Sequence, residues 1–222
     1  MADLTGRTVL VAGAGSASGL AATRALAAAG ARVVATGRNA ARLTPLAALG
    51  ADTEVVDLAD EVAVLGLVDR LRERGLAVDG VLHLVGGWRG GGGLAGQAEA
   101  DYRALEPSLT ALRHVSRALD DDLRSSPAGR LAIVSSTAVA RPLAGGANYA
   151  AVKAAAEAWT RAVAQGYAKA AREAGEPLRA AAVVYRVKAL AGLEDRLAAA
   201  YAGLWDADAA RLNDSIIEIH ER

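Results

Sequence analysis

Two residue types are missing from this chain of 222 residues, cysteine and phenylalanine. Without cysteine, the protein has no disulfides, no thiolate nucleophile and no cysteine-ligated metal site. Without phenylalanine, the expected core consists of leucine, valine and alanine. Neither sign of charge is in excess, because 25 lysines and arginines balance 25 acidic residues. No overall field therefore favours nucleic acid or an anionic membrane as a partner.

Long apolar runs are also missing. The first residues, MADLTGRTVLVAG, carry Asp3 and Arg7 and break at Gly6, which is unlike the apolar segment of a signal peptide. Charged residues interrupt the later alanine-rich stretches well before 18 positions, the length that a membrane-spanning helix needs. We therefore expect a soluble, cytoplasmic protein that binds no membrane. No motif indicates a metal site.

Short apolar, β-branched runs alternate with longer helical patterns along the whole chain. Strands with almost no polar residue are typical of parallel sheets covered on both faces. The pattern predicts an α/β fold, a doubly wound parallel sheet (Rossmann fold) with helices on both faces, as one domain over residues 1–222. We expect strands at 7–12, 31–36, 53–57, 80–85, 130–136 and 178–184, a candidate last strand at 215–219, helices at 18–29, 39–49, 60–74, 98–124 and 147–174, and N-caps at Asn39, Asp60 and Asn148.

A glycine-rich turn, AGAGSASGLAATRAL, follows the first expected strand. Gly13, Gly15 and Gly19 allow the backbone to approach a pyrophosphate, and the free N–H groups of the next helix face the anion. The spacing departs from a strict G-x-G-x-x-G, so a turn that binds nothing stays open as an alternative. The second strand ends at Gly37 and Arg38, where an acidic residue would repel a 2′-phosphate. Arg38 instead favours NADP(H), unless it is an ordinary surface arginine.

Tyr149 and Lys153 lie one helical turn apart and therefore on one face of the expected helix 147–174. A free tyrosine, with a pKa near 10, is a poor base at neutral pH. A nearby ammonium stabilises the phenolate and is expected to lower this pKa. Such a tyrosine can donate a proton to a carbonyl oxygen or accept one from an alcohol.

These residues resemble the short-chain dehydrogenase/reductase family. At the four fixed positions of its turn, T-G-x-x-x-G-x-G, this chain has Ala12, Gly13, Ala17 and Gly19, with alanine twice in place of the usual residue, and Tyr149 with Lys153 matches its Tyr-x-x-x-Lys pair. The resemblance implies a serine thirteen residues before the tyrosine, which is Ser136, with Ser135 as the competing candidate. The implied catalytic residues are Ser136, Tyr149 and Lys153, and the implied cofactor-binding residues are Gly13, Gly15, Ser16, Gly19, Leu20, Arg38, Asp57, Leu58, Val85, Gly86, Gly87, Tyr149 and Lys153.

The chain departs from the family pattern at several positions. Where relatives have Asn-Asn-Ala-Gly, this chain has HLVG, and His83 within it is expected to be a satisfied core histidine. Ser108 stands where many relatives have a proton-relay asparagine, and Pro107 is expected to disturb the helix there. Tyr185 and Arg186 replace the usual Pro-Gly. The helical flap that follows in relatives looks absent, which leaves the site open to water.

The resulting hypothesis is an NADP(H)-dependent oxidoreductase that acts on a small carbonyl or alcohol substrate. The resemblance also implies a homodimer or homotetramer. A second hypothesis is a nucleotide-binding regulatory or scaffold protein with little catalysis. A third follows from the VGGW segment, which resembles dihydropteridine reductases and would imply a quinonoid pterin as substrate. Trp88 and Arg89 are candidates for substrate contact, with a role as plain loop residues as the open alternative.

Overall fold

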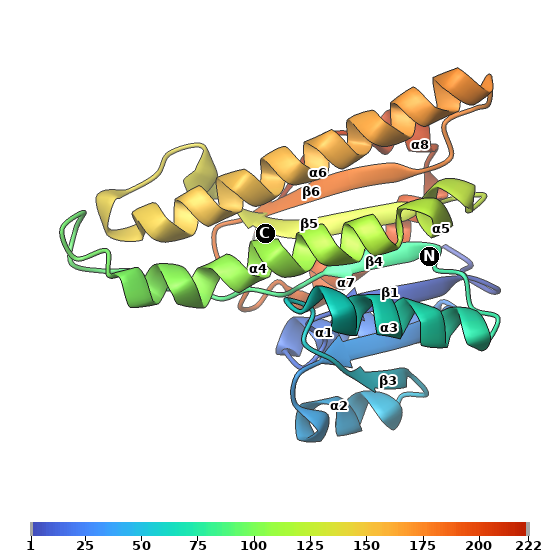
Figure 1. Ribbon diagram of the computed structural model, residues 1–222, viewed down its shortest axis with the longest axis horizontal. Coiled ribbons are helices and arrows are strands. Elements are labelled where there is room, and N and C mark those ends of the chain that lie inside the picture. Colours follow the sequence, from blue (N-terminus) through green and yellow to red (C-terminus); the bar gives the residue numbers. More distant parts are fainter. Residues whose placement is uncertain (1, 221–222) are drawn as a thin grey trace.

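The computed structural model describes residues 2–220 and contains one seven-stranded sheet in which every pair of neighbours is parallel (Figure 1). The strand order is β3-β2-β1-β4-β5-β6-β7. The predicted fold class and the candidate last strand are therefore confirmed. The strands are β1 (Thr8–Ala12), β2 (Arg32–Gly37), β3 (Asp52–Val55), β4 (Gly80–His83), β5 (Arg130–Ser136), β6 (Ala181–Val187) and β7 (Ser215–Ile219).

Helices cover both faces of the sheet. In Figure 1, α3, α4 and α6 lie in front of the strands, while α1 and α7 lie behind them. Each face has its own apolar core, because strand residues alternate in direction and the two helical layers receive alternate side chains. The helices are α1 (Ala17–Ala28), α2 (Ala40–Ala47), α3 (Glu61–Glu73), α4 (Glu99–Ala118), α5 (Asp120–Ser125), α6 (Ala147–Ala174), α7 (Glu194–Ala202) and α8 (Ala209–Leu212), with short 3₁₀ helices η1 (Thr137–Val139), η2 (Ala144–Gly146) and η3 (Gly203–Asp206).

Local hydrogen bonds explain where several helices begin. The side chains of Asn39 and Asp60 accept from backbone N–H groups in the first turns of α2 and α3, as predicted. The predicted cap at Asn148 is wrong, since α6 already begins at Ala147 and the Asn148 N–H donates to Gln97 Oε1 at 3.1 Å.

The predicted helix 98–124 is divided at Leu119 into α4 and α5. Pro107 lies inside α4 without ending it, contrary to the expectation. The sixth strand begins at Ala181, three residues later than predicted.

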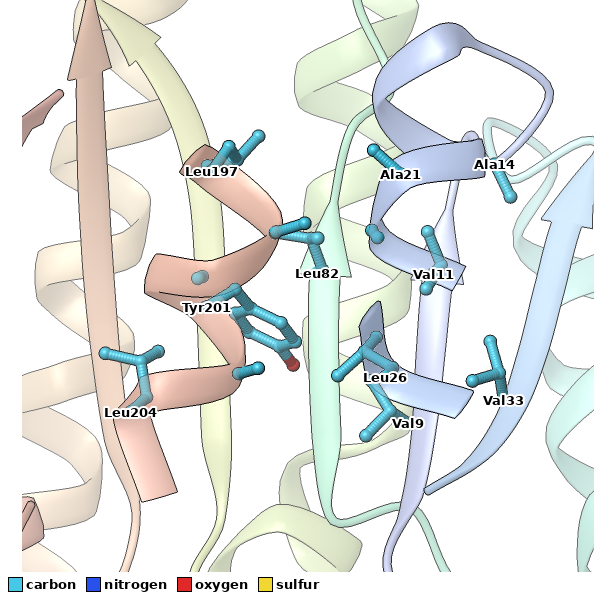
Figure 2. Packing of buried hydrophobic residues seen from close by; sticks show 14 of the residues in the cluster. Val9, Val11, Ala14, Ala21, Leu26, Val33, Leu82, Leu197, Tyr201 and Leu204 are labelled. Carbon is cyan, nitrogen blue, oxygen red and sulfur yellow. The ribbon is translucent and has the colours of Figure 1, made fainter. Parts of the chain in front are cut away.

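The core also contains tyrosines, which fill the role of the missing phenylalanines. The expectation of a core built from leucine, valine and alanine alone is therefore wrong. Tyr167, Tyr185 and Tyr201 are among the largest fully buried side chains. Figure 2 shows Tyr201 of α7 with its ring pointing toward β4, near Leu82. Its hydroxyl donates to the Arg130 carbonyl at 3.3 Å, which satisfies a polar atom that burial would otherwise leave unpaired.

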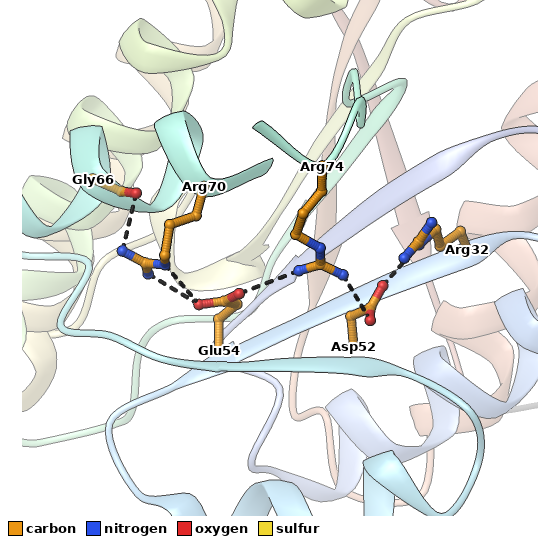
Figure 3. Close-up of polar contacts among 6 residues, drawn as sticks. All are labelled: Arg32, Asp52, Glu54, Gly66, Arg70 and Arg74. Atoms are coloured by element: carbon orange, nitrogen blue, oxygen red, sulfur yellow. Dashed lines mark hydrogen bonds and ion pairs between the residues drawn. The ribbon is translucent and has the colours of Figure 1, made fainter. Parts of the chain in front are cut away.

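Edge strand β3 carries a chain of ion pairs (Figure 3). Asp52 bonds Arg32 and Arg74, each at 2.8 Å, while Glu54 bonds Arg70 at 2.9 Å and Arg74 at 3.4 Å. These arginines are a third to a half exposed, so each pair adds little stability. The charges do discourage another strand from pairing with this edge.

The sheet order reverses at β1, which has β2 on one side and β4 on the other. The loops after β1 and β4 therefore leave the sheet in opposite directions and open a crevice between them, where open α/β sheets bind ligands. Across residues 2–220, no helix combines the length and hydropathy that crossing a bilayer requires.

Candidate active site

Two adjoining cavities lie at the carboxyl ends of the strands. One, of about 860 Å³, is lined by Ser136, Tyr149 and Lys153 and is called here the reaction cavity. The other, of about 730 Å³, is lined by Gly13 and Arg38 and is called the nucleotide cavity. Both are lined by Ser16, Leu84, Val85 and Gly86. The shared lining makes them two ends of one cleft.

The glycine turn after β1 is shaped by close backbone contacts. Gly13 has φ +80°, and a Cβ there would lie 2.9 Å from the Val85 nitrogen, so only glycine fits without strain. Ser16 begins α1, and its Oγ accepts from the Gly19 N–H at 3.1 Å. A Cβ on Gly19 would lie 2.0 Å from the Ala14 oxygen, so this glycine permits the turn to pack against the helix.

The structure brings most of the predicted cofactor-binding residues to this cleft, and two of them lie elsewhere. Gly19 and Leu20 line neither cavity; Leu20 instead packs against the core on the α1 face. The predicted residues that line the nucleotide cavity are Gly13, Gly15, Ser16, Arg38, Asp57, Leu58, Val85 and Gly86, and those that line the reaction cavity are Ser16, Val85, Gly86, Gly87, Tyr149 and Lys153.

Cationic side chains gather at the far end of the nucleotide cavity. Arg38 follows β2 and is exposed, and Arg42 lies on the first turns of α2 with its Cβ side against Gly15. Within residues 2–220, neither arginine forms an ion pair. The sequence interpretation missed Arg42, although its place one turn after Arg38 was a usable signal. Asp57 also lines this cavity, and its Oδ1 accepts from the Ala59 N–H at 3.0 Å.

The end of β5 distinguishes the two serine candidates. Ser135 is completely buried, and its Oγ donates to Glu157 at 2.6 Å, beneath the cleft. Ser136 points the other way, because neighbouring strand residues alternate, and it lines the reaction cavity. Its Oγ accepts from the Ala138 N–H at 3.1 Å, and Tyr149 lines the same cavity. Ser136, and not Ser135, therefore shares the cavity wall with the tyrosine.

Lys153 does not lower the pKa of Tyr149 in this arrangement, contrary to the expectation. Its Nζ donates to the Val134 carbonyl at 2.7 Å and lies 5.8 Å from the centre of the tyrosine ring. Burial raises the pKa of Tyr149, and the nearby Ser136 hydroxyl only partly opposes this. Protein atoms surround the ammonium although part of its side chain opens to the cleft, and this desolvation lowers the pKa of Lys153 to about 8.

His83 closes the floor of the reaction cavity and is only partly satisfied. Its Nε2 lies 3.1 Å from the Ser108 carbonyl. Because a carbonyl can only accept, Nε2 carries the hydrogen and Nδ1 is the bare nitrogen. Nδ1 is buried without a partner among the described residues, so the expectation of a satisfied core histidine is wrong in this respect. Burial and the nearby Lys153 ammonium lower the pKa of His83 to about 4.

Ser108 lines the nucleotide cavity, but its hydroxyl is already engaged. Its Oγ donates to the Leu105 carbonyl, one turn back on α4, at 2.7 Å. A serine hydroxyl has a single hydrogen, so this bond leaves Ser108 only as an acceptor toward the cleft. The serine side chain is also shorter than that of asparagine, so its hydroxyl cannot reach as far into the cleft as an asparagine amide.

The mouth of the reaction cavity is apolar. Trp88, Leu143 and Leu190 line it, and the first two are 62% and 73% exposed. The glycine-rich loop that carries Trp88 is tied to the segment before α6, since Gly91 N–H donates to the Gly145 carbonyl at 2.7 Å and Gln97 Nε2 donates to the same carbonyl at 3.0 Å. Leu143 and Leu190 were not identified from the sequence, because isolated leucines in loops carry no pattern.

The donor set and shape of the cleft fit a nicotinamide dinucleotide. A pyrophosphate fits where the backbone allows close approach at Gly13 and where α1 begins after Ser16. The cationic side chains around Arg38 suit a further anionic or polar group. Gly86, with φ +157°, brings the backbone to the level of Lys153, whose Nζ lies 3.5 Å from the position of an added Cβ. Over residues 2–220, no group of three or more metal-ligating side chains could hold an ion.

Comparison with known proteins agrees with this arrangement. The family model described as short chain dehydrogenase matches residues 7–171. A Pseudomonas syringae protein described as a short chain dehydrogenase is 23% identical, with a TM-score of 0.84 over 97% of this chain and 96% of that one. A Shigella flexneri 2a protein of the same description, complexed with NADP, is 21% identical, with a TM-score of 0.85 over 98% and 99%. An NAD⁺-bound xylitol dehydrogenase is 18% identical, with a TM-score of 0.82 over 97% and 98%.

At these identities the solved structures establish the fold alone, and a search of curated proteins found no significant match. The family model is the stronger finding, because it spans about three quarters of the chain and includes both the glycine turn and the Tyr149–Lys153 pair. This chain therefore belongs to the short chain dehydrogenase family, whose members are oxidoreductases that use a nicotinamide cofactor.

Proposed function

We propose that this protein is an NADP(H)-dependent oxidoreductase that interconverts a small carbonyl compound and its alcohol. The observation that carries the proposal is the convergence of Ser136, Tyr149 and Lys153 on one wall of a cavity that continues into the nucleotide cavity. A protein that only binds a nucleotide has no need for a hydroxyl pair and an ammonium at this end of the cleft.

Each of the three residues has a role that its surroundings support. The Ser136 hydroxyl hydrogen-bonds the substrate oxygen and keeps it within reach of Tyr149. Tyr149 donates the proton in reduction, and its raised pKa keeps the phenol protonated at neutral pH, as a general acid must be. The Lys153 ammonium, which faces the cleft beside Gly86, binds the ribose of the cofactor. The bound nicotinamide supplies or accepts the hydride.

The choice of NADP(H) over NAD(H) rests on the second strand. Gly37 leaves space at its end, and Arg38 and Arg42 offer two unpaired guanidinium groups to a 2′-phosphate. No carboxylate follows β2 directly to repel that phosphate; the next acidic residue near this cavity is Asp57, after β3. Guanidinium groups bind phosphate through two parallel hydrogen bonds, which makes them suitable for this selection.

The remaining parts of the proposal concern access and assembly. Only six residues, 188–193, connect β6 to α7, so we infer that the substrate flap of the family is shortened and that the reaction cavity is open on this side. We also propose a homodimer or homotetramer as the working form, a cytoplasmic location and one domain over residues 1–222.

A direct test combines nucleotide titration with turnover. Fluorescence titration with NADPH and NADH measures both affinities, and NADPH oxidation is then followed with ketones, aldehydes, quinones and a quinonoid pterin. Tyr149→Phe is expected to keep NADPH binding and to lose turnover by roughly 10²–10⁴-fold, the usual contribution of a positioned general acid. Full turnover in Tyr149→Phe would refute the catalytic assignment.

One observation favours a second candidate, a nucleotide-binding regulatory or scaffold protein. The Ser108 hydroxyl is used within α4, so no side chain at this position relays protons from solvent. Tight NADPH binding without turnover on any member of the panel would support this candidate over the enzyme.

A further inference from the structure

Glu157 is a buried carboxylate close to the reaction cavity. It lies on α6 four residues after Lys153, and therefore one helical turn further along the same face. Only 5% of its surface is exposed. Burying a carboxylate costs folding free energy unless the group is paired and hydrogen-bonded. The partners of Glu157 therefore show how this cost is offset.

Two neighbouring strands supply those partners. Ser135 of β5 donates to Glu157 Oε1 at 2.6 Å, while Arg186 of β6 donates from Nε to Oε1 at 2.9 Å and from Nη2 to Oε2 at 2.6 Å. Ser135 lies opposite Arg186 in the sheet register, so both reach the carboxylate from adjacent positions. The bidentate guanidinium bond fixes its orientation.

This cluster is adjacent to the candidate catalytic residues at two points. Ser135 directly precedes Ser136 on β5, and Glu157 follows Lys153 on α6. The bonds of Glu157 therefore join the helix that carries Tyr149 and Lys153 to the strand that carries Ser136. A shift of α6 along the sheet would have to break these bonds.

The charge of Glu157 also acts on Lys153. The titratable groups that face the ammonium are Glu157 and Tyr149 on α6 and His83 on β4, with Arg186 of β6 behind the carboxylate. Burial lowers the pKa of Lys153 to about 8, and Glu157 is the group that opposes this. The imidazole of His83 is neutral at pH 7 and cannot substitute for the carboxylate.

We propose that Glu157 is a positioning residue, which keeps Lys153 protonated and holds α6 in register with the strand bearing Ser136 through its bonds to Ser135 and Arg186. This rests on the function proposed above. The buried ion pair between Glu157 and Arg186, outside the reaction cavity, thus maintains the positive charge of Lys153 inside it.

The chain has only three lysines, Lys153, Lys169 and Lys188, which permits a direct test. Protein labelled with ¹³C,¹⁵N-lysine gives three side-chain signals, of which Lys153 is identified by its loss in Lys153→Met. In Glu157→Gln, the pKa of Lys153 is expected to fall below about 8. The alkaline limb of the kcat/KM pH profile should move in the same direction, with a loss that approaches roughly tenfold per pKa unit at pH values above that limb.

A matched control exists on the same helix. Lys169 and Glu173 have the same spacing, lie 3.7 Å apart and are each 68% exposed. Glu173→Gln is expected to leave the pKa of Lys153 and kcat/KM unchanged, because a solvated pair contributes little.

Glu157→Gln leaves the Arg186 guanidinium without its carboxylate, so a fold-preserving variant is also needed. The double variant Glu157→Met/Arg186→Met removes both charges together, which buried pairs tolerate better than loss of one partner. It should still lower the pKa of Lys153, since the nearer charge is lost, while Glu157→Asp should recover much of the original value.

An unchanged pKa of Lys153 in both Glu157→Gln and the double variant would overturn the proposal. A lowered pKa with an unchanged kcat/KM profile would also overturn it. The lysine titration requires neither cofactor nor substrate, so it remains decisive if the protein turns over nothing and the proposed function itself fails.

Discussion

Acidification should destabilise this protein through His83. The imidazole is 5% exposed, its Nε2 hydrogen is bound by the Ser108 carbonyl, and its Nδ1 has no hydrogen-bond partner among residues 2–220. A second proton would have to enter at Nδ1, inside the sheet and close to the Lys153 ammonium. The pKa of His83 is accordingly lowered from 6.5 to about 4.

The sign and size of the effect follow from this difference. Between pH 6.5 and 4 the unfolded chain binds a proton that the folded protein refuses, so stability is present above pH 6.5 and is lost as the pH falls toward 4. A fall of one pKa unit corresponds to about 1.4 kcal/mol. The full loss is therefore about 3 kcal/mol, of which about 2 kcal/mol is lost between pH 7 and pH 5.

The assay is urea unfolding at pH 7, 6, 5 and 4 for the wild type, for His83→Gln and for His220→Gln, a control at a largely exposed histidine. Because carboxylates titrate in all three proteins, the slopes of unfolding free energy against pH are compared between them. We expect His83→Gln to flatten the dependence of the unfolding free energy on pH by about 2–3 kcal/mol over this range, and His220→Gln to leave it unchanged. Equal slopes in all three proteins would refute the reasoning.

Three further predictions concern glycine geometry, a buried arginine and cofactor selection. Gly13→Ala should cost more unfolding free energy than Gly75→Ala, because both glycines have positive φ but only at Gly13 would the new Cβ meet backbone, that of Leu84 and Val85 just after β4. Equal losses in urea unfolding would contradict this. Arg130→Met should destabilise by about 3 kcal/mol, since it removes the guanidinium donor from the carbonyls of Arg179, Leu204 and Ala207, while the Gly129 carbonyl keeps the Ala181 N–H; a loss below about 1 kcal/mol would disagree. Arg38→Ala should weaken NADPH binding by roughly 10–100-fold and leave NADH binding nearly unchanged. Arg24→Ala, at an exposed arginine of α1, is the control. Equal losses of affinity for both nucleotides would exclude selection by Arg38.

Features that depend on neighbouring residues could be predicted from the sequence. The short β-branched runs predicted six strands and the candidate seventh, since a strand covered on both faces has few polar positions. The glycines after β1 predicted a tight turn, and the spacing of Tyr149 and Lys153 placed them on one helical face. The errors at element ends, such as the cap at Asn148 and the start of β6, arose where a partner far along the chain decides the geometry.

Features that depend on distant partners were decided only by the tertiary structure. Sequence spacing left Ser135 and Ser136 as competitors, and the alternation of β5 against α6 separates them. The same packing directs the Lys153 ammonium to a β5 carbonyl instead of the phenol, and it buries Glu157 against Arg186. Local backbone preferences act over a few residues and can be read along the chain, whereas hydrogen bonds and desolvation depend on which atoms the fold brings together. The sequence therefore determined the scaffold and the candidate pair Tyr149–Lys153, and the tertiary structure determined the charge states and orientation of these side chains.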